Sequence, residues 1–100
     1  MNKQTRYKIF FLTSFLLFAY CAIAQYTRNK AQARYEIDAK RQGVGPTDKD
    51  ALPRSREFLR LDSTYYVGWM YEGMYKYDRS TDYLGYKNAV IPLQKAFDLL

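Results

Sequence analysis

The fold of this chain is decided by the stretch FLRLDSTYYVGWMYEGMYKY (residues 58–77), DRSTDYLG (78–85) and YKNAVIPLQKAFDLL (86–100). The first block is crowded with large side chains, the second is polar and rich in turn residues, and the third carries a wide apolar face. Apolar residues that recur at spacings of three and four are typical of helices. The stretch therefore predicts two antiparallel helices, Tyr65 to Tyr77 and Tyr86 to Leu100, joined by a turn over residues 78–85.

Each of these predicted helices presents an apolar stripe. The stripe of the first helix consists of Tyr66, Trp69, Met70, Gly73 and Tyr77. The stripe of the second helix consists of Tyr86, Ala89, Val90, Leu93, Ala96, Phe97 and Leu100. Tyrosine also favours strands, but large side chains at adjacent positions break the alternation that a strand requires. Pro92 is expected to bend the second helix, because it removes one backbone hydrogen bond.

Two further helices are predicted upstream. Residues 25–42 contain several good helix formers and no glycine or proline. The sequence GVGPT at residues 43–47 then marks a turn. Residue 47 or 48 is expected to cap a helix that ends near Leu61, and residue 63 or 64 to cap the next one. The fold class predicted from the sequence is therefore all-α.

The first 24 residues follow the order of a secretory signal peptide. Basic residues at positions 3, 6 and 8 precede the mostly apolar run IFFLTSFLLFAY (residues 9–20), and small residues at Ala22 and Ala24 precede Gln25. A membrane span is the alternative, but it needs about 20 apolar residues. This run is shorter, and it contains Thr13 and Ser14. We therefore expect signal cleavage between Ala24 and Gln25, and no membrane span after signal removal.

Removal of the signal would also remove Cys21, the only cysteine. Tyr20 precedes it, where a lipoprotein anchor needs a small residue. The chain from Gln25 onward then holds neither cysteine nor histidine, so its fold depends on packing without disulfides. The expected localisation is the periplasm or cell envelope.

The net charge of +6 includes the basic residues of the signal. The remaining charges are interspersed; Arg60, for example, lies between Glu57 and Asp62. This pattern is typical of a solvated helix surface and not of a nucleic-acid patch, so no nucleic-acid partner is expected.

An internal repeat connects two of the predicted helices. Lys49 to Leu61 aligns with Lys87 to Leu99 at a constant offset of 38 residues. The aligned pairs include Ala51 with Ala89, Leu52 with Val90, and Leu59 with Phe97. Such self-similarity predicts helix pairs stacked as a short α-solenoid, in which each unit buries its apolar face against its neighbour.

These residues resemble the tetratricopeptide repeat (TPR) family. Its 34-residue helix–turn–helix unit places Trp four residues before Gly, and later has Ala, a large residue and Ala at spacings of four and three. Trp69 and Gly73 match the first pair, and Ala89, Leu93 and Ala96 match the second series. The resemblance covers residues 48–100, about one and a half repeats, and residues 25–47 form an N-terminal helix with a Gly/Pro turn.

The chain departs from the family pattern at several positions. Glu72 stands where the family has Leu, Lys76 where it has Tyr, and Ser63 where it usually has Pro. The turn between Gly73 and Ala89 is expected to be about four residues longer than the family's. The earlier repeat matches only in its second helix.

The resemblance implies roles for two sets of residues. In the family the first helices line a groove where partners bind, and the corresponding partner-binding positions here are Val67, Met70, Tyr71, Met74 and Tyr77. The set expected to pack between helices comprises Tyr66, Trp69, Gly73, Ala89, Leu93 and Ala96. The alternative is that the groove residues simply pack on the preceding helix or on a further repeat.

No residue pattern indicates catalysis. Serine and threonine have no histidine or retained cysteine to activate them, and Asp78 to Asp82 lacks the glycine and terminal glutamate of a calcium loop. We therefore expect no catalytic residue, cofactor or metal, and a non-enzymatic protein.

The leading hypothesis is an exported TPR-like adaptor that mediates protein–protein interaction in the cell envelope. One alternative is a tyrosine-rich module that binds a glycan or cell-wall chain, because aromatic rings stack on sugars. Another is the N-terminal piece of a larger repeat protein, since the apolar face of the last helix is left uncapped. That face also suggests self-association.

Overall fold

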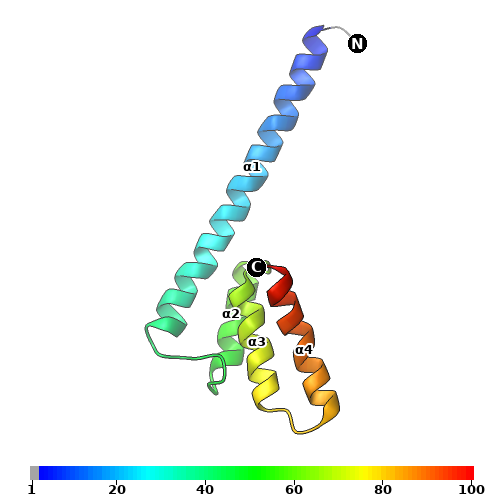
Figure 1. Ribbon diagram of the computed structural model, residues 1–100. Coiled ribbons are helices and arrows are strands. Elements are labelled where there is room, and N and C mark those ends of the chain that lie inside the picture. Colours follow the sequence, from blue (N-terminus) through cyan, green and yellow to red (C-terminus); the bar gives the residue numbers. More distant parts are fainter. Residues whose placement is uncertain (1–2) are drawn as a thin grey trace.

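The computed structural model describes residues 3–100, and the chain is built from helices. The elements are α1 (Lys3–Tyr35), the π-helical segment η1 (Glu36–Lys40), α2 (Ala51–Leu61), α3 (Tyr66–Asp78) and α4 (Tyr83–Asp98). Helices make up 80% of the structure, and no strand occurs within residues 3–100. The predicted all-α class is confirmed. Figure 1 shows α1 as a long rod whose C-terminal part reaches a small bundle of α2, α3 and α4.

Helix α1 is longer than the sequence predicts. In the uncleaved chain, α1 runs without interruption through the expected cleavage position after Ala24 and continues to Tyr35. No glycine or proline occurs before Gly43 to end it. The helical path ends where Gly43 adopts a positive φ of 71°, and the Val44 amide then donates to the Ala39 carbonyl at 2.9 Å. A glycine in this conformation is a common helix terminator.

The expected caps of α2 and α3 are wrong. Helix α2 begins at Ala51, and the Asp48 carboxylate accepts from the Asp50 amide one turn earlier, at 3.1 Å. Before α3, the Asp62 carboxylate accepts from both the amide and the hydroxyl of Thr64, at 2.9 and 2.6 Å. Aspartate side chains often bond to groups two residues ahead, and here those bonds shape the turns instead of capping the helices.

The turn between α3 and α4 is short, so the enlarged turn expected at residues 78–85 is not found. Helix α4 starts at Tyr83, because the Asp82 carboxylate accepts from the Gly85 amide at 2.8 Å and caps the helix there. The extra residues are absorbed into the helix. Helix α4 also continues through Pro92, which is buried.

The core is a cluster of aromatic rings. Phe58 of α2 is fully buried, and the rings of Tyr35, Tyr71 and Tyr65 meet it edge-on at centroid distances of 5.9, 5.8 and 6.5 Å. Edge-to-face aromatic pairs add to the energy of area burial. Because Tyr35 belongs to α1 and Tyr71 to α3, this one cluster joins three helices.

Two glycines let α3 approach its neighbours closely. A Cβ added at Gly68 would lie 2.6 Å from Leu59 Cδ2 of α2, and one at Gly73 would lie 2.5 Å from Leu93 Cγ of α4. Both distances are below any normal carbon–carbon contact. Helix α3 is therefore held between α2 and α4, and a leucine side chain of each neighbouring helix fills the space beside one glycine.

Candidate partner-binding surface

The five predicted groove residues do not form one exposed face. Val67 and Tyr71 are buried, and Met70 is partly buried against the aromatic core. Met74 and Tyr77 remain open, with exposed fractions of 37% and 52%. The sequence placed Val67 and Tyr71 at a binding groove, but the structure places them in the core with the α1 and α2 side chains.

The contacts of Tyr71 explain its position. Its ring meets Tyr35 of α1 at 6.1 Å, and its hydroxyl donates to the Val44 carbonyl at 2.8 Å. Burial, reinforced by Tyr35, raises the pKa of Tyr71. Burial likewise raises the pKa of Tyr65, whose hydroxyl donates to Gln32 of α1. The Tyr71 hydroxyl thus ties α3 to the turn after η1, and the Tyr65 hydroxyl ties the residue before α3 to α1.

The residues expected to pack between helices divide into two groups. Gly73, Ala89 and Ala96 are buried, and Leu93 is partly buried against Gly73. The aromatic members are different. Trp69 lies at the edge, where its indole donates to the Ser63 carbonyl at 2.7 Å and the Lys95 ammonium lies 4.4 Å from its ring centroid.

Tyr66 is 38% exposed, whereas Tyr71 is buried. The environments predicted for these two tyrosines are thus exchanged. Tyr66 lines an open cleft with Leu99 and Leu100, whereas Tyr35 of α1 packs on Tyr71.

Met74 and Tyr77 begin an apolar surface that continues onto α4. With Thr47, Asp78 and Leu93 they line a cavity of about 210 Å³. The Tyr77 ring also meets that of Tyr86 at 5.0 Å, and from Tyr86 an exposed stripe continues along α4 through Val90 to Phe97. We call this set the α3/α4 surface; it consists of Met74, Tyr77, Tyr86, Val90, Leu93 and Phe97.

The sequence reasoning missed that α4 has two different apolar flanks. It assigned all seven stripe residues to one face, but the structure separates small residues from large ones. Ala89 and Ala96 face α3, whereas Val90 and Phe97 point outward. Residue size was the available signal, because alanines permit close helix approach and bulky residues do not.

A second cleft lies at the other end of the bundle. It is lined by residues of α1, of the α2–α3 connection, of the start of α3 and of the chain after α4, namely Gln25, Arg28, Asn29, Gln32, Thr64, Tyr65, Tyr66, Leu99 and Leu100. The cleft therefore brings residues 99 and 100 close to the part of α1 that directly follows its apolar run.

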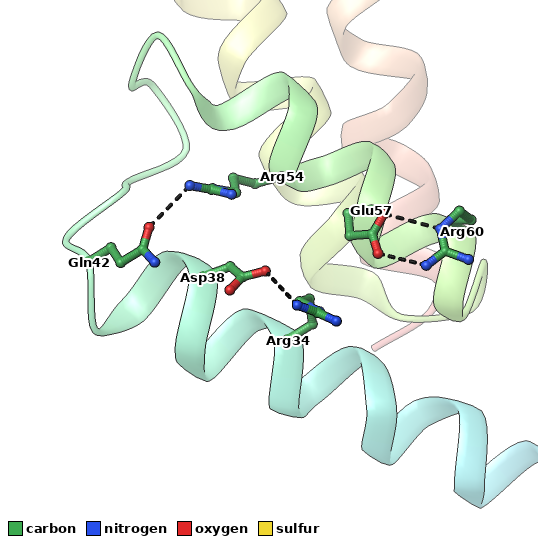
Figure 2. Close-up of polar contacts among 6 residues, drawn as sticks. All are labelled: Arg34, Asp38, Gln42, Arg54, Glu57 and Arg60. Atoms are coloured by element: carbon green, nitrogen blue, oxygen red, sulfur yellow. Dashed lines mark hydrogen bonds and ion pairs between the residues drawn. The ribbon is translucent and has the colours of Figure 1, made fainter.

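One side-chain hydrogen bond links the residues after η1 to α2, and the neighbouring ion pairs lie within single helical segments. Figure 2 shows Arg34 with Asp38 on the α1 side at 3.3 Å, and Arg54 of α2 donating to Gln42 at 3.1 Å. In the same view the Arg60 guanidinium donates two hydrogen bonds to the Glu57 carboxylate, at 2.7 and 3.1 Å. The hydrogen bond from Arg60 lowers the pKa of Glu57. These are exposed helix-surface pairs, which contribute little stability each.

No group of three or more histidine, cysteine, aspartate or glutamate side chains that could hold a metal ion occurs in residues 3–100. The groups whose pKa values shift are tyrosine hydroxyls in the core and one surface ion pair.

Helix α1 also has a property of its own. Together with η1 it is long and apolar enough, by length and composition, to cross a membrane. A signal sequence near the N-terminus meets the same criterion, so this helix agrees with export in either form.

Comparison of the chain with protein-family models, with curated proteins and with solved structures gives no match. The resemblance to the TPR family therefore rests on Trp69, Gly73 and the series from Ala89 to Ala96.

Proposed function

We propose that residues 25–100 form an exported helical adaptor that binds a helix of another protein through the α3/α4 surface. The observation that carries this proposal is the uncovered flank of α4, which corresponds to the flank by which α2 holds α3.

The 38-residue offset relates the two helices position by position. Ala51 of α2 and Ala89 of α4 are both fully buried, and Phe58 corresponds to Ala96, also buried. These positions are covered in both helices. The next position, Leu59, packs against Gly68 of the helix that follows α2. Its counterpart Phe97 is 69% exposed.

No helix follows α4 within residues 3–100 to cover Phe97. The flank of α4 that would hold a following helix is therefore open, and it carries large apolar side chains. Isolated exposed apolar residues are ordinary, but a contiguous apolar patch marks an interaction site.

The composition of the surface indicates the kind of partner. Methionine adapts its shape to different partners, and tyrosine is enriched at protein interfaces. By analogy with Gly68 beneath Leu59, the partner helix would present a small residue to Phe97. In this proposal the hairpin of α1 and α2 and the hairpin of α3 and α4 are two units of a TPR-like solenoid, and the partner supplies the next helix.

The test compares two pairs of exposed residues on α4. The Val90→Ala/Phe97→Ala variant removes side chains of the α3/α4 surface. The matched control Leu84→Ala/Ile91→Ala removes side chains of similar exposure and equal spacing from the other flank. We expect proteins captured from the native cells by the full chain to be lost with the first variant and kept with the second.

Circular dichroism of both variants must show unchanged helix content for this comparison to count. Equal capture by both variants, or capture by neither the parent chain nor the control, would overturn the proposal.

A further inference from the structure

The N-terminal two-thirds of α1 carries an apolar surface that nothing covers. Its large apolar side chains between Ile9 and Ile23 are each at least half exposed. They occupy all sides of the helix, since Phe10, Phe11 and Leu12 are consecutive. A helix that is apolar all round belongs in a protein core or in a bilayer, and the bundle of α2, α3 and α4 lies beside only the other end of α1 (Figure 1).

The ends of this apolar run match the two interfaces of a bilayer. Exposed tyrosines, Tyr7 and Tyr26, stand at the two ends. Nineteen residues separate them, which at about 1.5 Å per residue places them about 28 Å apart along the helix. The hydrocarbon layer is about 30 Å thick, and tyrosine is enriched at both of its boundaries. Lys8 and Arg28 have side chains long enough to extend into the headgroup layers.

A polar residue inside the run is neutralised by the helix itself. The Thr13 hydroxyl donates to the Ile9 carbonyl at 2.9 Å. A hydroxyl that bonds to its own helix is compatible with a hydrocarbon environment. Thr13 is therefore no obstacle to a span.

The apolar helix enters the bundle without a linker. The bond between Ala24 and Gln25 lies inside α1. Three residues beyond Ala24, the Thr27 hydroxyl contacts the Asp62 carboxylate at 3.4 Å, and Ala31 is fully buried. The helix that carries the apolar run therefore continues directly into the part of α1 that contacts the turn after α2.

We infer that α1 is retained as a membrane anchor, and that Tyr66, Leu99 and Leu100 rest on the surface of the bilayer that α1 crosses. The inference replaces the expected signal cleavage and adds a lipid partner to the proposed adaptor.

The position of the second cleft supports the lipid contact. Leu99 and Leu100 line the same cleft as Gln25 and Arg28. Gln25 directly follows the apolar run, and Arg28 lies three residues, or about 5 Å, further along the axis. The headgroup layer is about 5–7 Å thick on each side of the hydrocarbon. Residues 99 and 100 therefore lie at headgroup depth when α1 spans the bilayer.

The exposed side chains at this end suit that depth. Leu100 is 78% exposed, and Tyr66 of the same cleft is open as well. Transfer of a leucine side chain out of water is favourable, and a tyrosine has an apolar ring with a polar tip. The turn between α3 and α4 lies at the opposite end of the bundle, away from the N-terminus of α1 (Figure 1).

Retention of the anchor is tested on the full chain in the cells that make it. We expect the membrane pellet after alkaline carbonate extraction to contain a chain that still carries the residues before Gln25, identified by mass spectrometry of its N-terminal peptides. A chain that begins at Gln25, or one that carbonate releases, would overturn the anchor. Neither result depends on the α4 flank, so failure here is distinct from failure of the adaptor proposal.

The lipid contact is tested with a fluorescent probe at two positions. In a Cys21→Ser background, Leu100→Cys and Tyr83→Cys each receive an environment-sensitive fluorophore. The full chain is then reconstituted in vesicles of phosphatidylcholine and phosphatidylglycerol. We expect a blue shift, and loss of fluorescence with nitroxide-headgroup lipid, at position 100 but not at position 83. Equal quenching at both positions would contradict the contact.

A blue shift at position 100 without quenching by the nitroxide lipid would mean that a protein, such as a second copy of the chain, covers it. That outcome also overturns the lipid contact.

Discussion

The close approach of α3 and α4 at Gly73 predicts a destabilisation whose size depends on the neighbouring Leu93 side chain. A Cβ at residue 73 would lie 2.5 Å from Leu93 Cγ, 2.7 Å from Leu93 Cδ2 and 3.0 Å from the Leu93 amide nitrogen. Carbon atoms prefer about 3.5–4.0 Å. The substitution Gly73→Ala therefore requires α3 and α4 to move apart, or Leu93 to leave its position.

Two opposing effects set the magnitude. Overpacking typically costs about 1–3 kcal/mol, and replacing a mid-helix glycine by alanine returns about 1 kcal/mol of helix propensity. The backbone of α4 is also close, so we expect the upper part of the overpacking range and a net destabilisation of about 1–2 kcal/mol. In a Leu93→Ala background the side-chain clash disappears, and the same substitution should then be close to neutral.

Urea unfolding of the four variants, followed by circular dichroism of the full chain in detergent micelles, measures this coupling. A double-mutant cycle should give an interaction energy of about 1–2 kcal/mol. If Gly73→Ala is equally destabilising with and without the Leu93 side chain, the close approach is not what requires glycine at this position.

Three further predictions concern the aromatic core. Phe58→Ala should cost about 3–5 kcal/mol and abolish the folding of the bundle, seen as loss of the thermal transition. Tyr71→Phe leaves the Val44 carbonyl without its donor and should cost about 1 kcal/mol in urea unfolding, whereas Met74→Ala should change stability by less than about 0.5 kcal/mol. Because burial raises the pKa values of Tyr71 and Tyr65, the unfolded chain loses these protons first as the pH rises above about 10. Stability should therefore fall above that pH in thermal melts, with a shallower fall in Tyr71→Phe; a stability independent of alkaline pH would contradict this.

The sequence predicted the number and type of the helices because apolar spacing is a local property. The same spacing does not say which side of a helix each neighbour occupies. Helix α3 has α2 on one side, α4 on another and α1 on a third, so a single apolar stripe could not describe it. Gly68 was overlooked for this reason, although it holds the α2 contact as Gly73 holds the α4 contact.

Helix boundaries were less predictable because they depend on which of several nearby side chains accepts a hydrogen bond from a free backbone amide. Asp78, Ser80 and Asp82 were all plausible turn residues, and the structure uses Asp82 to start α4 at Tyr83. The environments of Tyr66 and Tyr71 depended on α1, whose length the sequence reasoning divided at Ala24. Residues far apart in the chain decide such positions.

The proposed anchor and the proposed helix partner constrain each other. Helix α3 begins at Tyr66, in the cleft beside the membrane end of α1, and runs to the distant turn along α2. If the repeat relation holds, a partner helix on α4 runs in the same direction as α3, starting beside Phe97 and passing Val90 and Tyr86. Such a helix leaves the bilayer surface at its N-terminal end. The geometry therefore favours a partner anchored in the same membrane. The lipid contact of Leu99 and Leu100 would keep the α3/α4 surface perpendicular to the bilayer, in the orientation that such a partner needs.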